Sequence, residues 1–213
     1  MKFADKSYIF FVLSIIASLS ILLFLFIWLN LESLNSQNFE HKVSDFIQSF
    51  RDDELTSYMK FVTQVGDLYG YIAIILILGF FLLLKRRFNL VIQIVSVVVS
   101  SALLNLVLKS LITRPRPYGE ALVKVNFHSF PSGHAMSAIV FYGLMIYFLF
   151  ELKSFNLKVL LSMICVLMIF FIGVSRIYLG VHYPTDVVAG YLGGLSSLCI
   201  GLMLIRVFSL KSP

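Results

Sequence analysis

The sequence predicts an all-α integral membrane bundle of six transmembrane helices, with amphipathic helical structure in the first outer loop. Of the 213 residues, 59% are hydrophobic and only 13% are charged, whereas soluble domains are about half apolar and a quarter charged. The apolar residues form long runs, and a membrane span needs about 20 such residues. No repeat or low-complexity tract divides the chain, so residues 1–213 are expected to form a single membrane-embedded domain.

Six apolar runs qualify as spans. The first of them is not followed by a small-residue cleavage site, so we interpret it as a retained span and not as a signal peptide. Cys165 and Cys199 lie inside apolar runs, which is typical of buried small hydrophobic residues and not of a disulfide or a metal pair. The six predicted spans are Tyr8–Leu29, Leu68–Leu84, Leu90–Ile112, Met136–Leu152, Val159–Val174 and Val187–Phe208.

The basic residues set the expected orientation. The net charge is +6, but these residues lie beside apolar runs, so they indicate topology signals and anionic lipid and do not indicate a nucleic acid partner. If both termini are cytoplasmic, only Asp5 and Glu151 among the acidic residues join the basic residues on that side. The cytoplasmic basic residues are then Lys2, Lys6, Lys85, Arg86, Arg87, Lys153, Lys158, Arg206 and Lys211.

The first outer connection, Asn30–Asp67, predicts either two short amphipathic helices or one kinked helix. Apolar residues recur at helical spacing on both sides of the charged run Arg51–Glu54, but the two sets are out of phase. Such helices suit the outer membrane face. We expect them to pack over the bundle, and a role in substrate binding is the less favoured alternative. His41 has no partner pattern and is assigned no role.

The stretch Ser175–Asp186 places an Arg, a His and an Asp between two apolar runs, where charge is costly and therefore indicates function. Arg176 offers a fixed fork of donors to phosphate oxygens. His182 can act as nucleophile or proton carrier near neutral pH, and Asp186 can hold its imidazole in one tautomer. Pro184 suits the first position of the next helix, which puts Asp186 in the first turn. Alternatively, Arg176 is an interfacial anchor and the other two residues cap that helix.

A second stretch adds positive charge on the same side of the membrane. Lys109 ends the third span and is followed by Arg114-Pro115-Arg116-Pro117. The prolines disfavour a continuing helix, so the chain is expected to turn here into the outer loop. A lone Lys at a span end is usually a snorkelling anchor, but two arginines close behind it favour an anion site.

A third stretch, Phe130–His134, precedes the fourth span. Ser132 suits a helix N-cap, and Gly133 lets a ligand approach the backbone closely. The free N–H groups of the first helical turn form an anion site, and His134 lies in that turn. Taken alone, this is also an ordinary capping motif. Its significance comes from sharing the outer side with the two stretches above.

Together, the three stretches resemble the signature of the type 2 phosphatidic acid phosphatase superfamily, the integral-membrane lipid phosphate phosphatases. The family pattern is Lys, six residues, Arg-Pro; then Pro-Ser-Gly-His; then Ser-Arg, five residues, His, three residues, Asp. Every element is present here in order and at that spacing, and six spans are also typical of the family. The spacing selects Arg116 and leaves the roles of Arg114 and His128 open. The matching residues are Lys109, Arg116-Pro117, Pro131–His134, Ser175-Arg176, His182 and Asp186.

The resemblance implies a phosphatase that needs no metal and no cofactor. By this resemblance, His182 attacks phosphorus and forms a phosphohistidine, Asp186 orients it, and His134 protonates the leaving oxygen and then activates water. The residue types alone do not say which histidine attacks. The residues that the resemblance implies as ligands of the phosphoryl oxygens are Lys109, Arg116, Ser132, Gly133 and Arg176.

The resemblance also implies a lipid phosphate substrate, and no protein partner is indicated. The candidates are undecaprenyl diphosphate, phosphatidylglycerol phosphate and phosphatidic acid, and the motifs cannot rank them because they bind the phosphate that all three share. We expect a bacterial cell membrane protein with its site on the extracytoplasmic side. The alternative is a non-hydrolytic lipid-binding or transporter-like protein of the same fold. A transporter would place polar groups near the bilayer midplane, where this chain has only scattered Ser, Asn and Gln.

Overall fold

The computed structural model describes residues 3–31, 33–84, 86, 88–117, 119–150 and 152–209. Every regular element within these ranges is a helix. Five of the charged residues that set the expected orientation lie outside the described residues, namely Lys2, Lys85, Arg87, Glu151 and Lys211. In chain order the helices are α1 (Phe3–Leu29), α2 (Leu34–Gln48), α3 (Asp53–Val65), α4 (Leu68–Leu84), α5 (Phe88–Leu111), α6 (Gly133–Leu149), α7 (Phe155–Tyr178) and α8 (Pro184–Ser209).

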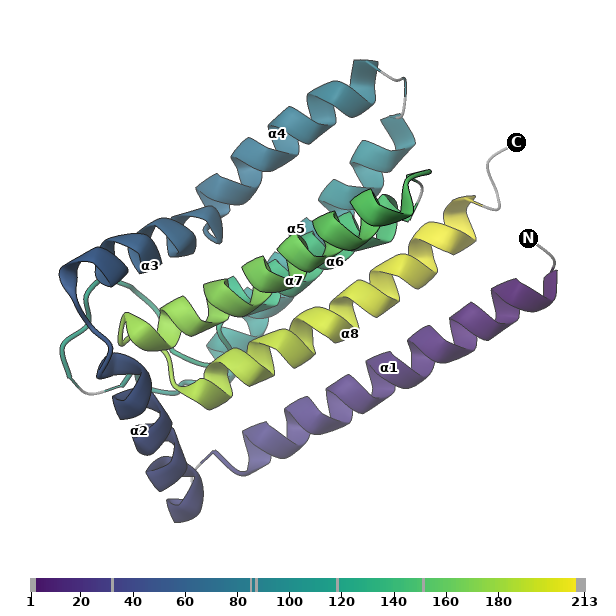
Figure 1. Cartoon of the computed structure of the whole chain (residues 1–213). Coiled ribbons are helices and arrows are strands. Elements are labelled where there is room, and N and C mark those ends of the chain that lie inside the picture. The colour runs from purple at the N-terminus through teal and green to yellow at the C-terminus, as the bar shows by residue number, and fades with distance from the viewer. Residues whose placement is uncertain are drawn as a thin grey trace.

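The long helices run along one another, and the two ends of the bundle differ (Figure 1). α1 begins and α8 ends at one end, where the α4–α5 and α6–α7 turns also lie. At the other end lie α2, α3, the long connection between α5 and α6, and the short turn between α7 and α8. We call this second end the α2/α3 end.

Four of the described helical segments are long and apolar enough to cross a membrane, and α6 is a shorter apolar helix. The prediction of an all-helical, multi-pass membrane protein is therefore confirmed. The four segments are Ser7–Leu29, Phe88–Leu111, Phe155–Tyr178 and Pro184–Val207.

Glycines let α6 and α8 approach until their backbones are close. A Cβ at Gly190 of α8 would lie 2.6 Å from the carbonyl oxygen of Ser132, and one at Gly194 would lie 2.6 Å from that of Met136. Small residues at helix interfaces permit this kind of approach in membrane proteins. The backbone N–H of Ser132 consequently donates to the carbonyl oxygen of Asp186 at 2.9 Å, which joins the starts of the two helices.

The helix boundaries differ from the predicted spans where polar residues are buried. α7 continues to Tyr178, beyond the predicted end at Val174, because Ser175 and Arg176 are buried inside the protein and do not mark a water boundary. α6 likewise begins at Gly133, ahead of the predicted start. α8 begins at Pro184, as the position of the proline predicts.

In the structure the first outer connection contains the two helices α2 and α3. The side chain of Asp52 accepts a hydrogen bond from the backbone N–H of Leu55 at 2.8 Å and so caps the start of α3. Both helices pack against α7, as expected. Gln48, at the end of α2, and Arg51, in the link between α2 and α3, bind the C-terminal carbonyl oxygens of α7. Gln48 Nε2 donates to Ile177 at 3.1 Å, and Arg51 Nε and Nη2 donate to Tyr178 at 3.0 and 2.8 Å.

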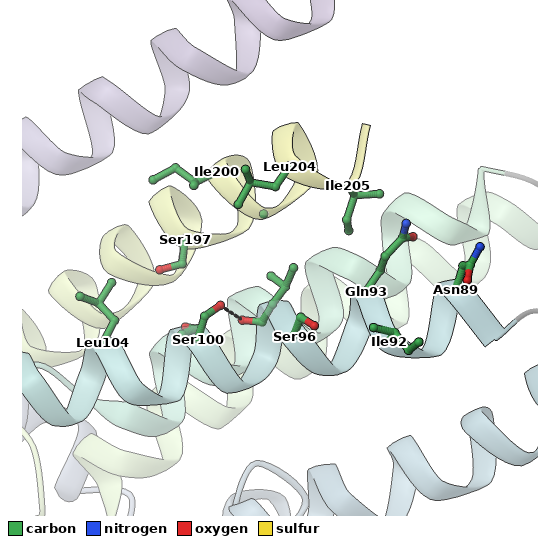
Figure 2. A pocket seen from close by; sticks show the side chains of 13 residues that line it. Asn89, Ile92, Gln93, Ser96, Ser100, Leu104, Ser197, Ile200, Leu204 and Ile205 are labelled. Carbon is green, nitrogen blue, oxygen red and sulfur yellow. Dashed lines mark hydrogen bonds between the residues drawn. The ribbon is translucent and has the colours of Figure 1, made fainter. Parts of the chain in front are cut away.

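A cavity of about 750 Å³ lies between α5 and α8. Four polar residues share one face of α5 and line the wall of the cavity (Figure 2). Gln93, Ser96 and Ser100 belong to the third predicted span, and Asn89 immediately precedes it. Ser197 of α8 faces them across the cavity.

Candidate active site

The turn between α7 and α8 presents His182. Gly180 adopts a left-handed conformation with φ +74°, which is typical of the residue that ends a helix. The backbone N–H groups of Val181 and His182 then donate to the carbonyl oxygen of Arg176 at 3.2 and 3.3 Å. The turn is enclosed, and the His182 side chain is only 3% exposed.

His182 and Asp186 form a buried pair across the start of α8. His182 Nδ1 lies 3.4 Å from Asp186 Oδ2, and the carboxylate is fully buried. The same Oδ2 accepts a hydrogen bond from the backbone N–H of Tyr183 at 2.9 Å. If Nδ1 carries the proton and faces the carboxylate, Nε2 keeps a free lone pair.

Burial lowers the pKa of His182 to about 4, and the cations of Arg176 and Lys109 act in the same direction against the opposing effect of Asp186. Burial disfavours the charged imidazolium because a low-dielectric interior solvates it poorly. The ring is therefore neutral at pH 7. A neutral imidazole is the form that can act as a nucleophile.

The start of α6 supplies His134 and the anion-binding backbone. Ser132 occupies the N-cap position, as predicted, but its side chain makes no capping hydrogen bond. Its Oγ is buried and has no hydrogen-bond partner among the described residues. A Cβ at Gly133 would lie 2.9 Å from Asn105 Oδ1, so a side chain here would displace Asn105. His134 follows in the first turn, with Nε2 3.9 Å from Asp67 Oδ1.

Lys109 and Arg116 are held by backbone carbonyl oxygens. Lys109 Nζ, in the last turn of α5, donates to His128 at 2.6 Å. Arg116 reaches across the connection and donates through Nη1 to Val181, in the turn that carries His182, at 2.6 Å. Its other nitrogens donate to the carbonyls of Phe127 and Asn126. Burial lowers the pKa of Arg116, although Asp186 opposes the change.

Arg176 lies in the last turn of α7, only 3% exposed. Its Nη1 donates to Thr63 Oγ1 of α3 at 2.5 Å. Its buried Nε has no hydrogen-bond partner among the described residues. The hydrogen bonds described for Lys109, Arg116 and Arg176 all go to neutral oxygens, so the positive charge of these residues stays available to an anion.

All eight predicted site residues therefore lie at the α2/α3 end, although they come from four helices, the α5–α6 connection and the α7–α8 turn. His134 is close enough to interact electrostatically with Arg176, His182, Lys109 and Arg116. Two other residues of the outer connection contribute through their backbones: His128 accepts from Lys109, and Glu120 accepts from Arg51.

Arg114, which was left open at the sequence level, contacts Asp186 directly. Its Nη1 donates to Asp186 Oδ1 at 2.6 Å, and its Nη2 donates to Glu40 Oε2 of α2 at 2.5 Å. Burial lowers the pKa of Arg114, but the two carboxylates outweigh this effect and raise it. The sequence reasoning missed Glu40. The available signal was its position on α2, four residues before Ser44 and seven before Ile47, which places it on the same helical face.

The chain is similar to several known proteins. The PAP2 superfamily profile matches residues 89–209, which include all three motif stretches. Phosphatidylglycerophosphatase B of Bacillus subtilis (strain 168) is 33% identical over 161 residues, which cover 75% of this chain and 79% of that protein. Bacitracin transport permease protein BcrC of Bacillus licheniformis is 34% identical over 125 residues, which cover 54% of this chain and 56% of that protein.

Two solved structures share the fold. The transmembrane PAP2 type phosphatidylglycerolphosphate phosphatase from Bacillus subtilis superposes with a TM-score of 0.82 at 29% identity, covering 92% of this chain and 97% of that one. LpxE of Aquifex aeolicus superposes with a TM-score of 0.62 at 25% identity, covering 76% of this chain and 93% of that one.

The fold and the site thus define a membrane-embedded phosphoric ester hydrolase. The chain belongs to the PAP2 superfamily, and it is a multi-pass lipid phosphatase of that family. The resemblance that the three motif stretches carry is confirmed.

Proposed function

We propose that this enzyme hydrolyses a lipid phosphomonoester or diphosphate without a metal ion, through a phosphohistidine on His182. The observation that carries the proposal is the buried, neutral His182 held against Asp186, beside cations that are bound to neutral groups. Such an arrangement combines a nucleophile with uncompensated positive charge for the phosphoryl oxygens.

In the first step, His182 Nε2 attacks phosphorus while the bond from phosphorus to the lipid oxygen breaks. His134 donates a proton to that oxygen, and Asp186 stabilises the positive charge that develops on the His182 ring. In the second step, His134 accepts a proton from water as the water attacks the phosphohistidine. Inorganic phosphate leaves, and both histidines return to their initial state.

The proposed phosphate ligands suit the developing charge. Ser132 Oγ and Arg176 Nε are buried polar atoms without partners among the described residues, and a phosphoryl oxygen would satisfy both. Gly133 opens the first N–H groups of α6 to the same oxygens. Lys109 and Arg116 complete the set of cations.

The same set of charges supports the proposed metal independence. Among the described residues, no group of three or more His, Cys, Asp or Glu side chains could hold a metal ion. The arginines and the lysine supply the charge neutralisation that a metal would otherwise provide. Hydrolysis should therefore survive excess chelator, and loss of activity that magnesium restores would refute this mechanism.

We take the substrate to be a phosphorylated lipid whose head group faces the α2/α3 end. The names of two relatives, which are phosphatidylglycerolphosphate phosphatases, make phosphatidylglycerol phosphate the first lipid to test. Undecaprenyl diphosphate and phosphatidic acid follow, because the same cations would bind their phosphates.

The decisive experiment assays purified protein in detergent, with chelator, against these three lipids. We expect phosphate release from at least one of them and none from a matched His182→Ala preparation. Turnover by His182→Ala at the wild-type rate would remove the proposed nucleophile. Absence of release from all three lipids would remove the proposed substrate class.

We further propose six spans, with both termini in the cytoplasm and the α2/α3 end outside. Lys124 is exposed in the outer connection. A Lys124→Cys variant without Cys165 and Cys199 should react with an impermeant thiol reagent in intact cells. An Arg86→Cys variant in the same background should react only after permeabilisation. The reverse result would place the site on the inner face.

A further inference from the structure

Arg114 differs from the other cations at the α2/α3 end because carboxylates hold it on two sides. Its Nη1 lies 2.6 Å from Asp186 Oδ1, and its Nη2 lies 2.5 Å from Glu40 Oε2. Nη1 also donates to Thr185 Oγ1 at 2.9 Å. Thr185 Oγ1 in turn donates to the other oxygen of Glu40. The guanidinium lies over the Tyr183 ring, 4.2 Å from its centroid. The four polar groups form a closed network on the side of Asp186 away from His182.

Burial makes this network more than a surface ion pair. The side chains of Glu40 and Asp186 are 1% and 0% exposed, and that of Arg114 is 12% exposed. Two buried carboxylates without a cation between them would repel each other. Arg114 lies between them and offsets this repulsion.

The charges in the network add up to a single negative charge. Arg114 alone would neutralise Asp186 and leave it a weak partner for a positively charged imidazole. Glu40 competes for the same guanidinium, so the net formal charge of Glu40, Arg114 and Asp186 together is −1. The two oxygens of Asp186 also have different partners: Oδ1 binds Arg114, and Oδ2 faces His182 and the Tyr183 N–H.

We propose that Arg114 and Glu40 are positioning residues of the phosphatase site, which hold Asp186 in one orientation and keep its negative charge available to His182. Because Glu40 belongs to α2, this outer helix takes part in catalysis without touching the substrate. The inference rests on the proposed role of His182.

The test compares Glu40→Gln, Arg114→Gln and the double variant, with exposed Glu54→Gln and Arg86→Gln as matched controls. Each single change should lower kcat by about 10–100-fold, as is typical when a residue that orients a catalytic group is removed, with a much smaller change in KM. Glu40→Gln leaves the network neutral. Arg114→Gln leaves two facing carboxylates.

The double variant restores the charge of −1 with an amide pair in place of the ion pair. It should therefore be more active than Arg114→Gln alone, and the two losses should not multiply. Trapping of labelled phosphoenzyme should fall and recover in parallel with kcat. Both controls should keep wild-type values.

The acid side of the kcat/KM profile gives a readout that a purely structural role would not move. Loss of the Glu40 charge should shift this limb to lower pH, because the network is then neutral and stabilises the protonated form of His182 less. The other groups that face His182 are unchanged in the variant: Arg176 of α7, Lys109 of α5, His134 of α6 and Asp186 of α8.

Three results would overturn the inference: wild-type kcat in Glu40→Gln, an unmoved acid limb, or losses that simply multiply in the double variant. If Arg114→Gln does not fold, the kcat and pH profile of Glu40→Gln decide alone. Failure of the proposed function would look different, because His182→Ala would then retain turnover or the wild-type enzyme would release no phosphate.

Discussion

At the α2/α3 end of the bundle several ionisable side chains are buried, whereas at the opposite end most of the described turn residues are exposed. Asp186 is 0% exposed and Arg176 is 3% exposed. At the opposite end, Phe150 and Phe155 on either side of the α6–α7 turn are 70% and 74% exposed. Both ends join long apolar helices. Only the α2/α3 end adds two short helices and a long connection, and these provide the hydrogen bonds that make buried charge tolerable.

The difference between the two ends indicates which contacts hold the site in place. The last carbonyls of a helix have no partner inside the helix, and the turn after α7 supplies backbone N–H donors to those of Ser175, Arg176 and Ile177. Side chains add further donors: Gln48 binds the carbonyl of Ile177, Arg51 binds that of Tyr178, and Arg116 binds that of Val181. The turn that carries His182 is therefore fixed from outside the bundle. Changes at this end should cost activity and stability, and equivalent changes at the opposite end should cost little.

The largest effect is expected for the two histidines. His182→Ala should abolish turnover and the trapped phosphoenzyme, with a loss of more than about 10³-fold. His134→Ala should slow a natural lipid ester by about 10²–10⁴-fold, the usual contribution of a general acid. It should slow a substrate with a good leaving group much less, because that group departs without protonation. Labelled phosphate recovered on His134 would reverse the two roles.

A second prediction uses the pH dependence of stability. The pKa of His182 is lowered from 6.5 to about 4 in the folded protein, so the unfolded chain binds a proton more readily than the folded one. Its contribution to stability is therefore fully present above pH 6.5 and is lost as the pH falls toward 4. Thermal unfolding in detergent should show this loss in wild type and a weaker one in His182→Gln.

The matched control for this experiment is His128→Gln, which removes an exposed histidine and leaves His182 in place. Parallel curves for wild type and His182→Gln would contradict the prediction, because they would mean that the buried ring does not account for the acid sensitivity.

Arg51 tests the hydrogen bonds that the link between α2 and α3 supplies to the end of α7. Arg51→Ala removes both donors to the carbonyl of Tyr178 and should lower the free energy of unfolding by about 1–3 kcal/mol, the usual cost of an unsatisfied buried group. Arg86→Ala, in the exposed α4–α5 turn, should stay within about 0.5 kcal/mol of wild type. Denaturant unfolding in detergent measures both. Equal effects would mean that the two ends are held in the same way.

Much of the fold could be predicted from the sequence because apolar runs report directly on membrane spans. The same signal misplaced the end of α7, since a buried Arg176 looks like a water boundary when only hydropathy is considered. The site residues were predicted through motif spacing, and the structure brings all eight to one end. Their catalytic roles stay predictions.

The network behind Asp186 could not be predicted in the same way. Arg114 and Glu40 are 74 residues apart along the chain, and helical periodicity says which face a residue occupies but not what that face meets. Thr63, which binds Arg176, was missed for the same reason. Contacts of this kind depend on how α2 and α3 pack, and one sequence carries no direct signal for that packing.

The smallest effect on stability is expected for two serines that are alike in burial and different in place. Ser132 lies at the α2/α3 end and Ser101 lies in the middle of α5, beside the cavity of Figure 2. Each has a buried Oγ without a hydrogen-bond partner among the described residues. Replacing either by alanine removes a hydroxyl that makes no bond, so the free energy of unfolding should change by less than about 1 kcal/mol.

Their kinetics should nevertheless differ. If Ser132 Oγ binds a phosphoryl oxygen, Ser132→Ala should lower kcat/KM by roughly 10–150-fold, since a hydrogen bond to a charged group is worth about 1.5–3 kcal/mol. Ser101→Ala should keep wild-type kinetics. Steady-state assays and thermal unfolding on the same two preparations separate the effects. Equal kinetic losses would mean that the unpartnered hydroxyl of Ser132 has no special relation to the substrate, and that the contrast between the two parts of the molecule does not extend to single buried polar atoms.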